Sequence, residues 1–408
     1  MKPMTCRSCS SDRIKIVVDL GMQPLANRLL TECQINETEP RHPLRLSICE
    51  ECLLLQITDT VPPVELFTEY VYFSSVSDFL LQHVAKACSS HQERFGLNRG
   101  SFVVEVASND GYLLRNFVAA GIPCLGIEPA ANIAAVAEKR GVPTINRFFS
   151  TALASELKFQ GRTADIIIAH NVMGHVPDTN DFVQGLATLL KPGGRVILEF
   201  PYARDMIDHA EFDTIYHEHV FYFTILALQP LFARHGLEII DVERLAIHGG
   251  SLRIYAAHQG AHPIESSVTQ VLAEEKACGM DRVDWYTRFG EQVLKIRTDL
   301  TALLAQLKSE GHSIAAYGAS AKGSTLLNFC GLGGETIDFV VDRSPAKQGR
   351  RTPGTHLPIV PAEELAVRRP DYALLLTWNF AEEILQQQQP YRDLGGRFII
   401  PLPEVRVV

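Results

Sequence analysis

The chain has 408 residues, enough for two or three domains, and its 46% hydrophobic and 21% charged residues are typical of a soluble globular protein. Its net charge of −9 argues against binding nucleic acid through phosphates, and no apolar run is long enough to span a membrane. Residues 1–6 lack the apolar core of a signal peptide, so we expect a cytoplasmic protein with reduced thiols and no nucleic-acid or membrane partner.

Two C-x-x-C pairs stand near the amino terminus, Cys6 with Cys9 and Cys49 with Cys52. Each pair presents two thiolates to one ion, and four sulfurs in a tetrahedron suit Zn²⁺. A closed four-sulfur site is structural, so we expect zinc to hold together a module too small to bury a core of its own. A catalytic or nucleic-acid-reading zinc finger is the alternative, although no basic helix follows the pairs. The long gap between the pairs must loop out as an insertion.

An aromatic segment, residues 66–75, follows the cysteine pairs and contains Tyr70. Packing of amphipathic aromatic side chains explains this segment without a functional role. A helix is expected next, near Asp78–Glu93.

The central feature of the sequence is a strand, a loop of small polar residues and a helix that opens at Tyr112. The next strand ends in Glu128, whose carboxylate can accept hydrogen bonds from ribose hydroxyls. The loop lacks the three glycines of a dinucleotide fingerprint, and Glu105 at the end of the first strand would repel a diphosphate. A carboxylate there suits a cationic ligand such as S-adenosylmethionine (SAM).

Methyltransferases that use SAM commonly carry the loop E/D-x-G-x-G-x-G, in which Ala107 and Asn109 replace the first two glycines here. Alanine fits this position if its φ angle stays negative. An ordinary βα turn without a ligand is the alternative. The residues predicted to contact the cofactor are Glu105, Ala107, Ser108, Asn109, Gly111, Glu128, Pro129 and Asn171.

Strand and helix signals then alternate through the middle of the chain. We expect strands at 143–145 and 165–170, and a tight turn at 191–194 leading into a strand at 195–200. Alternation of this kind predicts a mainly parallel sheet with helices on both faces and ligands beyond the carboxyl ends of its strands. His175 follows one such strand end, where a structural and a functional role are equally compatible with the sequence.

The densest group of titratable side chains lies between residues 213 and 223 and includes Tyr216, His217, Glu218 and His219. The spacing differs from the H-E-x-x-H of zinc proteases, and a metal site on the two histidines lacks a third ligand. Acid/base chemistry is the better interpretation, because a histidine beside a carboxylate is a base near neutral pH and a tyrosine can donate to an oxyanion.

The C-terminal part begins with helical periodicity over 291–307, followed by a strand at 313–317 and a small-residue turn around Lys322. Backbone N–H groups at that helix start form a plausible anion site for a sugar diphosphate. A structural or dimerising domain with a solvated basic loop is the alternative. The residues predicted to bind substrate are His248, Lys322, Ser324, Arg343, Lys347, Arg351, Trp378 and Asn379.

Together these motifs make the chain resemble the sugar C-methyltransferases that act on nucleotide-linked 4-keto deoxysugars. The resemblance covers nearly the whole chain and rests on the cysteine pairs, the E-x-x-S-N-D-G loop and segments 20–27, 175–178, 216–219 and 248–251. It implies an α/β fold with an N-terminal zinc-binding module (1–75), a central Rossmann-like SAM domain (76–280) and a C-terminal Rossmann-like domain (281–408) that holds the nucleotide sugar.

The resemblance also implies the roles of the site residues. His219 corresponds to the family's base, with Glu218 and Tyr216 beside it, and His175 and Tyr70 match two further active-site residues. We expect methylation at C3 of a 4-keto-6-deoxyhexose carried by thymidine diphosphate, in a monomer or weak dimer. In this mechanism Glu218 orients His219, while His175 or Tyr216 stabilises the enolate oxygen. An O- or N-methyltransferase and a non-catalytic zinc-dependent binding protein are the rival functions.

Overall fold

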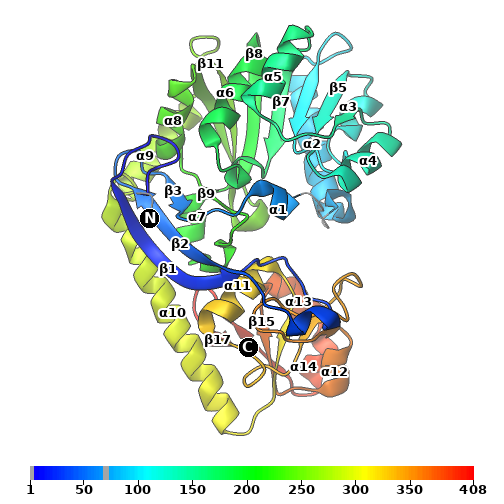
Figure 1. Ribbon diagram of the computed structural model, residues 1–408, viewed down its shortest axis with the longest axis vertical. Coiled ribbons are helices and arrows are strands. Elements are labelled where there is room, and N and C mark those ends of the chain that lie inside the picture. Colours follow the sequence, from blue (N-terminus) through cyan, green and yellow to red (C-terminus); the bar gives the residue numbers. More distant parts are fainter. Residues whose placement is uncertain (1–3, 68–72) are drawn as a thin grey trace.

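The computed structural model describes residues 4–67 and 73–408, so Tyr70 lies outside the described residues. Three sheets organise the chain: one of seven strands, one of six, and an antiparallel one of four (Figure 1). The two larger sheets occupy opposite ends of the molecule, and a long hairpin of the small sheet lies between them. The carboxyl edge of the seven-stranded sheet faces this middle region, which contains the predicted catalytic residues.

The seven-stranded sheet forms the core of the central domain. Its order is β10 (Leu237–Leu245), β11 (Ser251–His258), β8 (Leu190–Pro201), β7 (Ala164–His170), β4 (Val103–Val106), β5 (Cys124–Ile127) and β6 (Thr144–Ile145). From β8 to β6 all neighbours are parallel, and β11 runs antiparallel to both of its neighbours. This is the mainly parallel sheet that the alternating signals predict.

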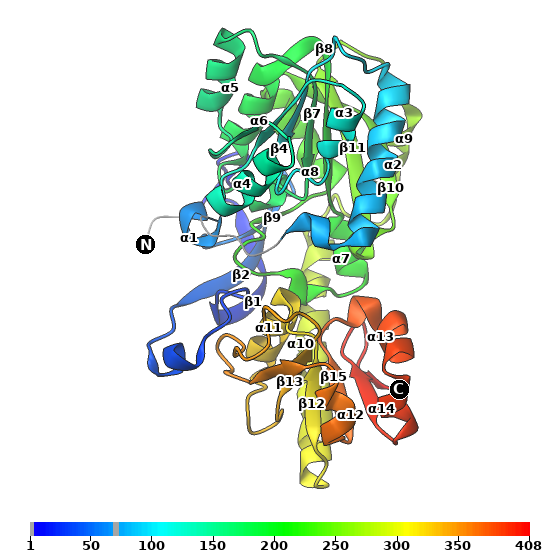
Figure 2. The same cartoon turned by 90° about the vertical axis from the view of Figure 1, so that its right-hand side faces the viewer.

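Helices cover both faces of this sheet because alternate strand residues point to opposite sides. Ile166 and Ile168 join a buried cluster with α2 and α3, whereas Ile167 and Ala169 join a cluster that includes α5 and α6. Figure 2 shows α2 standing against one face. The helices of this domain are α2 (Asp78–Phe95), α3 (Arg115–Ala119), α4 (Ala131–Lys139), α5 (Thr151–Phe159), α6 (Thr179–Leu189), α7 (Ala203–Asp208), α8 (Ile225–Arg234) and α9 (Ser266–Ala277).

The turn predicted at 191–194 is wrong as an element boundary, because these residues lie inside β8. They form a bulge in β8 where the register with β7 shifts. Ala164 pairs with Leu190, but Ile166, only two residues further along β7, pairs with Arg195. A side chain at Gly194 would approach the Asp165 carbonyl oxygen to 2.9 Å, so glycine is needed where β8 crosses its neighbour closely. The glycines that suggested a turn therefore serve a bulge.

The four-stranded sheet joins the N-terminal module to the central domain. Its strands are β1 (Ile14–Pro24), β2 (Arg41–Cys49), β3 (Leu55–Ile57) and β9 (Phe221–Tyr222). The long insertion between the cysteine pairs is the β1–β2 hairpin. The last strand comes from the central domain, since Leu55 pairs with Tyr222 and Gln56 with Phe221. The module therefore continues into the segment that directly follows His219. A short helix, α1 (Pro63–Phe67), leads away from β3.

The C-terminal domain contains the third sheet. Its order is β14 (Ile359–Pro361), β13 (Val340–Asp342), β12 (Ile314–Tyr317), β15 (Tyr372–Leu375), β16 (Arg397–Ile400) and β17 (Arg406–Val407), parallel except for β17. Its helices are α11 (Ala321–Cys330), α12 (Glu364–Arg368), α13 (Ala381–Gln387) and α14 (Gln389–Asp393). The strand order reverses between β12 and β15, and the crevice at such a point is where ligands bind in doubly wound sheets.

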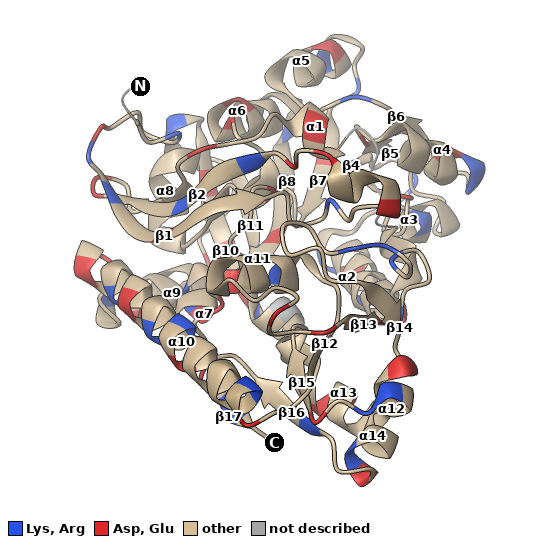
Figure 3. Cartoon of the chain, turned by 60° about the horizontal axis from the view of Figure 1, so that its bottom comes forward, with Lys and Arg blue, Asp and Glu red and all other residues tan. Residues whose placement is uncertain are grey.

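The long helix α10 (Val283–Ser309) connects the central and C-terminal domains and crosses β1 on the way (Figure 1). A side chain at Gly290 would reach the Val17 carbonyl oxygen at 2.0 Å, so glycine permits this close crossing. Acidic and basic residues are interspersed along α10 (Figure 3), as expected for a solvated helix face. No described helix combines the length and apolar composition required to cross a membrane.

His91 on α2 is a buried histidine outside the candidate site. Within the described part of the chain neither of its ring nitrogens has a hydrogen-bond partner, and the ring packs against Phe95 and Tyr255. Burial, together with the nearby cation of Arg253, lowers the pKa of His91 from its ordinary 6.5 to about 3. The unfolded chain therefore takes up this proton near pH 6.5 and the folded chain only near pH 3. Folding stability is consequently lost as the pH falls through that window.

We expect His91→Phe to stabilise the protein by about 1 kcal/mol at pH 7, because it removes two unpaired polar atoms from an aromatic cluster. The gain should grow below pH 6.5, since the variant has no proton to take up on unfolding. Denaturant unfolding between pH 4 and pH 8 measures both effects. His262→Phe, at a partly exposed loop position away from the His91 cluster, is the control. An unchanged pH dependence in His91→Phe would show that other groups cause the acid sensitivity.

Candidate active site

The four N-terminal cysteines converge on one point. Their sulfur atoms all lie within 4.8 Å of one another, with 3.5 Å between Cys6 and Cys52 and 3.5 Å between Cys9 and Cys49. Tetrahedral zinc with bonds of ~2.3 Å separates its sulfurs by ~3.8 Å, so this donor set fits zinc. Three of the four cysteines are buried, which suits a structural ion with no open position for substrate. Among the described residues, these cysteines form the sole His, Cys, Asp and Glu cluster compact enough to share an ion.

The predicted cofactor residues gather at the carboxyl edge of β4, β5 and β7. Glu105 is fully buried, and burial raises its pKa well above the ordinary value, with the nearby Glu128 and Asp110 raising it further. Three buried oxygens at this edge, on Glu105, Ser108 and Asn171, have no hydrogen-bond partner among the described residues. Buried polar atoms are rarely left unpaired, so this edge suits a ligand with a cationic group and hydrogen-bond donors. SAM has both, and these residues therefore fit it.

The loop after β4 keeps the backbone of a glycine loop without the glycines. Ala107 and Asn109 have φ angles of +52° and +48°. The condition that φ stays negative at Ala107 is therefore not met, and a left-handed alanine costs about 1 kcal/mol. Glycine is needed at position 111 for two reasons. Its φ angle of +76° is unfavourable for other residues, and an added Cβ would lie 2.8 Å from the Val142 side chain. The helix after this loop begins at Arg115, three residues later than predicted.

Glu128 shapes this loop and follows β5, where the sequence predicts a contact with ribose hydroxyls. One of its carboxylate oxygens accepts from the Asn109 backbone N–H at 2.9 Å, and the other accepts from that of Ala130 at 2.9 Å. Each oxygen retains a lone pair for a ribose hydroxyl. The neighbouring Pro129 is half-buried, and its carbonyl oxygen accepts from Asn146 at 2.8 Å.

The imidazole of His219 is held at both nitrogens. Its Nδ1 lies 2.8 Å from the Thr214 carbonyl oxygen and its Nε2 lies 2.8 Å from the Tyr216 hydroxyl. A carbonyl oxygen only accepts, so Nδ1 carries the proton and donates to it. The lone pair of Nε2 then accepts from the Tyr216 O–H. This is the tautomer that a base needs, with a phenol already beside the basic nitrogen.

The sequence predicts that Glu218 orients His219, but the structure gives the Glu218 carboxylate a different partner. The Glu218 carboxylate accepts from the Asn27 side chain at 2.7 Å, and burial raises its pKa. Residues 216–219 form a turn, closed by the His219 N–H on the Tyr216 carbonyl oxygen, and Thr214 supplies the hydrogen bond that orients the His219 ring. The alternative of a metal on both histidines is also disfavoured, because His217 lies against the Pro43 carbonyl oxygen at 3.3 Å.

His175 belongs to a single helical turn (Met173–His175) after β7, and its ring packs edge-on against His219 with 4.9 Å between centroids. Its Nδ1 lies 2.7 Å from the Glu218 backbone carbonyl oxygen, to which it donates. Burial lowers the pKa of His175, so the ring is neutral at pH 7. A neutral ring protonated at Nδ1 presents an acceptor at Nε2 and cannot donate from that atom to an oxyanion.

Two of the predicted substrate residues reach the central domain. The Lys322 ammonium lies 3.2 Å from the Glu211 carboxylate and 5.2 Å from the Trp378 ring centroid. Trp378 donates from Nε1 to Asp213 at 2.7 Å. Both follow strand ends at the reversal point of the third sheet, so that sheet's carboxyl edge faces the loop with His219.

The other predicted substrate residues have different surroundings. Three basic side chains engage protein groups: Arg343 donates to Gln387, Lys347 to the Ala319 carbonyl oxygen, and Arg351 to Glu32 of the N-terminal module. The Ser324 hydroxyl donates to its own helix at Ser320, Asn379 is exposed, and the His248 side chain is not among those described. These positions do not form one anion site in this structure.

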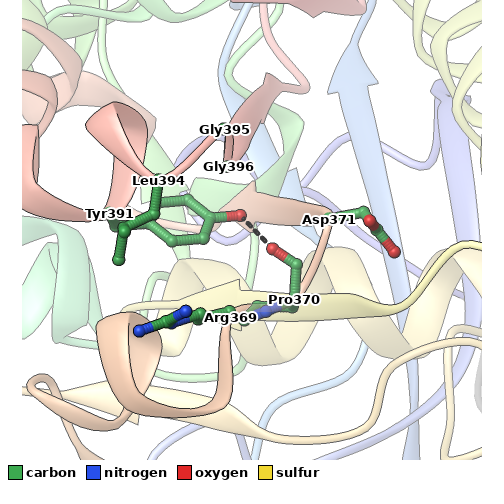
Figure 4. Close-up of a pocket in the computed structure, with 7 residues that line it drawn as sticks. All are labelled: Arg369, Pro370, Asp371, Tyr391, Leu394, Gly395 and Gly396. Atoms are coloured by element: carbon green, nitrogen blue, oxygen red, sulfur yellow. Dashed lines mark hydrogen bonds between the residues drawn. The ribbon is translucent and has the colours of Figure 1, made fainter.

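Sequence reasoning missed Asn27, Glu211, Asp213 and Thr214. The first lies in the LGMQPLAN segment used for the resemblance, and the others directly precede the Tyr-His-Glu-His motif, which is the signal that could have identified them. A hollow of about 70 Å³ between Pro370, Tyr391 and Gly396 (Figure 4) lies at the amino ends of β15 and β16. It is at the edge of the sheet opposite to the reversal-point crevice and has no part in this site.

Comparisons with known proteins agree with this architecture. Three family models match consecutive segments: a zinc binding domain over 6–67, a methyltransferase domain over 80–242 and a C-methyltransferase C-terminal domain over 246–403. The C-methyltransferase NovU of Streptomyces niveus is 37% identical over 404 residues, which are 99% of this chain and 96% of that protein. An uncharacterized methyltransferase of Mycobacterium leprae is 31% identical over 101 residues, 25% of this chain and 37% of that protein.

Among solved structures, the magnesium protoporphyrin IX methyltransferase of Synechocystis PCC 6803 with bound SAM covers 47% of this chain and 86% of its own. Its sequence identity is 16% and the TM-score is 0.35.

Proposed function

The chain belongs to the C-methyltransferase family, in which a zinc-binding domain, a methyltransferase domain and a C-terminal domain follow one another, and on this basis we propose its reaction and substrate. The reaction is methylation at C3 of a 4-keto-6-deoxyhexose linked to a nucleoside diphosphate, with thymidine diphosphate as the carrier. The product serves deoxysugar biosynthesis. SAM supplies the methyl group, held by the buried acidic edge of β4, β5 and β7.

One observation carries this proposal: the His219 imidazole is protonated at Nδ1, and its basic Nε2 accepts from the phenol of Tyr216. Transfer to an oxygen or nitrogen nucleophile needs no strong base, because those atoms already have lone pairs. A carbon nucleophile must be made by removing a proton from carbon. A ketone at C4 acidifies the C3 hydrogen, and a base with an oxyanion donor then matches the reaction.

In the proposed mechanism His219 Nε2 takes the C3 proton, and the C–H electron pair becomes the C3–C4 double bond of an enolate. The Tyr216 hydroxyl turns from Nε2 to the C4 oxygen and donates to it, which contributes roughly 3 kcal/mol in a water-poor site. C3 of the enolate then bonds to the methyl carbon, while the electron pair of the breaking carbon–sulfur bond stays on sulfur. The proton on half-exposed His219 finally leaves to solvent.

This assignment refines the choice between Tyr216 and His175 as the enolate partner. Tyr216 has an O–H to donate, whereas neutral His175 uses its one N–H on the Glu218 carbonyl oxygen. His175 therefore supports the His219 ring by edge contact and offers Nε2 as an acceptor for a sugar hydroxyl.

The nucleotide part of the substrate is assigned to the reversal point of the third sheet, with its diphosphate beside Lys322. Lys322 is partly exposed and paired with Glu211, so a diphosphate would compete for its ammonium group. From this crevice a sugar can extend towards the Tyr216–His219 pair, since α11 packs on the residues just before them.

Hydrogen–deuterium exchange at C3 tests the proposal directly. A 4-keto nucleotide sugar is incubated in D₂O with the enzyme and S-adenosylhomocysteine, which cannot donate a methyl group. We expect enzyme-dependent incorporation of one deuterium at C3, detected by NMR, and methylation at C3 when SAM is present. Methylation at oxygen or nitrogen without exchange at C3 would favour an O- or N-methyltransferase. Failure to bind SAM in a calorimetric titration would favour a non-catalytic binding protein.

A further inference from the structure

The single helical turn η4 (Phe212–Thr214) lies between the C-terminal domain and His219, the proposed base. Three contacts hold η4 on the C-terminal domain. Phe212 packs against Phe329 with 5.3 Å between ring centroids, Glu211 pairs with Lys322, and Asp213 accepts from the Trp378 indole N–H at 2.7 Å. The last contact joins residues that are 165 positions apart in the sequence.

The Asp213–Trp378 bond is set in a buried environment. Asp213 has no exposed surface, and burial raises its pKa, while the Lys322 charge and the indole hydrogen bond oppose that rise. A buried carboxyl group that loses a donor must move to find another or bear the cost of an unpaired oxygen. The indole N–H is therefore one of the groups that fix Asp213, together with the Lys322 charge and the backbone of residues 213 and 214.

The peptide that follows Asp213 carries the critical acceptor. The Thr214 carbonyl oxygen accepts from His219 Nδ1 at 2.8 Å and from the buried Tyr222 hydroxyl at 3.1 Å. This carbonyl fixes the tautomer of His219 and the direction of its ring. A shift of Asp213 would turn the adjoining peptide and weaken the bond that keeps the proton on Nδ1.

We propose that Trp378 is a positioning residue for the base: its indole N–H fixes Asp213, and through the Thr214 carbonyl it fixes the ring and tautomer of His219. This inference rests on the proposed function, in which His219 is the base. It assigns Trp378 a role different from the substrate contact predicted from the sequence. The C-terminal domain, to which the nucleotide is assigned, therefore also controls the ring orientation and the tautomer of His219.

The two roles of Trp378 predict different kinetics. A positioning residue affects the rate of proton removal, so its loss lowers kcat and leaves KM for the nucleotide sugar nearly unchanged. A residue that stacks on the substrate mainly affects KM. Trp378→Phe separates these cases, because phenylalanine keeps an aromatic ring beside Lys322 and removes only the N–H donor and part of the ring.

We expect Trp378→Phe to lower kcat and the rate of C3 deuterium exchange together, on the order of tenfold, with KM within about twofold of the wild type. Asp213→Ala should cause a similar loss, and the double variant Trp378→Phe/Asp213→Ala no more than either alone, because all three lack the same bond. Asp213→Asn keeps an amide oxygen that accepts from the indole and should retain most of the activity. Trp285→Phe, at the chain's other tryptophan, is the matched control.

A rise in KM for Trp378→Phe with unchanged kcat would overturn the inference, as would losses that multiply in the double variant. Circular dichroism and SAM titration of each variant show whether the fold and the cofactor site are intact. If one variant does not fold, the Asp213→Asn comparison still tests the bond. Failure of the proposed function is distinguishable, because it would abolish C3 exchange in the wild type itself.

Discussion

Replacement of His219 by glutamine is expected to lower methyl transfer by on the order of 10³-fold or more, with the affinity for SAM within about twofold of the wild type. Glutamine can still donate to the Thr214 carbonyl oxygen and accept from Tyr216, so the loop keeps its hydrogen bonds. An amide has no basicity near neutral pH and cannot take a proton from carbon. The cofactor residues lie on other strand ends, so their geometry should not change.

Two measurements complete this test. Single-turnover methylation and C3 exchange should both be lost in His219→Gln, because both need the same deprotonation. His262→Gln, at a partly exposed histidine outside the site, should retain wild-type activity in both assays. Exchange that persists in His219→Gln would remove His219 as the base and move the search to Tyr216 and His175.

The fold was largely predictable because its signals are local. Apolar runs such as 165–170 predict buried strands, and the C-x-x-C pairs predict a zinc-binding module. The α/β class, that module and the family are all confirmed. The domain boundary near residue 280 stays a prediction; the third family model begins at 246, before β11 of the central sheet. The bulge in β8 was missed because glycines give the same signal whether a chain turns or passes close to a neighbour.

The structure brings several of the predicted site residues close together, but their hydrogen-bond partners differ from those that the sequence suggested. The Tyr-His-Glu-His motif marks a reactive segment from its composition alone, whereas the partners of these residues are set by tertiary contacts. Glu218 bonds to Asn27, 191 residues away, although His219 is its neighbour in sequence. The sequence predicts an anion site at Lys322. It does not reveal that the Lys322 ammonium pairs with Glu211, because Glu211 lies in another domain. Sequence proximity predicts which side chains share a region, and the fold decides which atoms meet.

Loss of the zinc ion is the second change expected to abolish activity, although no cysteine touches the reacting groups. Zinc binding to four cysteines supplies on the order of 10 kcal/mol to the folding of a small module. Cys49 and Cys52 directly precede β3, and β3 pairs with β9, which starts two residues after His219. A module without zinc would release β3, and β9 and the catalytic loop would lose that neighbour.

We therefore expect Cys52→Ser to lose bound zinc and at least about a hundredfold of C3 exchange and methylation, while SAM binding changes only a few-fold. The cofactor edge belongs to the seven-stranded sheet, which shares no strand with the zinc module and whose α2/α3 face has a core separate from that module. Metal analysis, calorimetric SAM titration and exchange are measured on the same samples, with exposed Cys33→Ser as the control. A zinc-free Cys52→Ser protein with normal exchange would mean that β9 holds the base in place without β3. Equal loss of SAM binding would mean that the module supports the whole central domain rather than the catalytic loop.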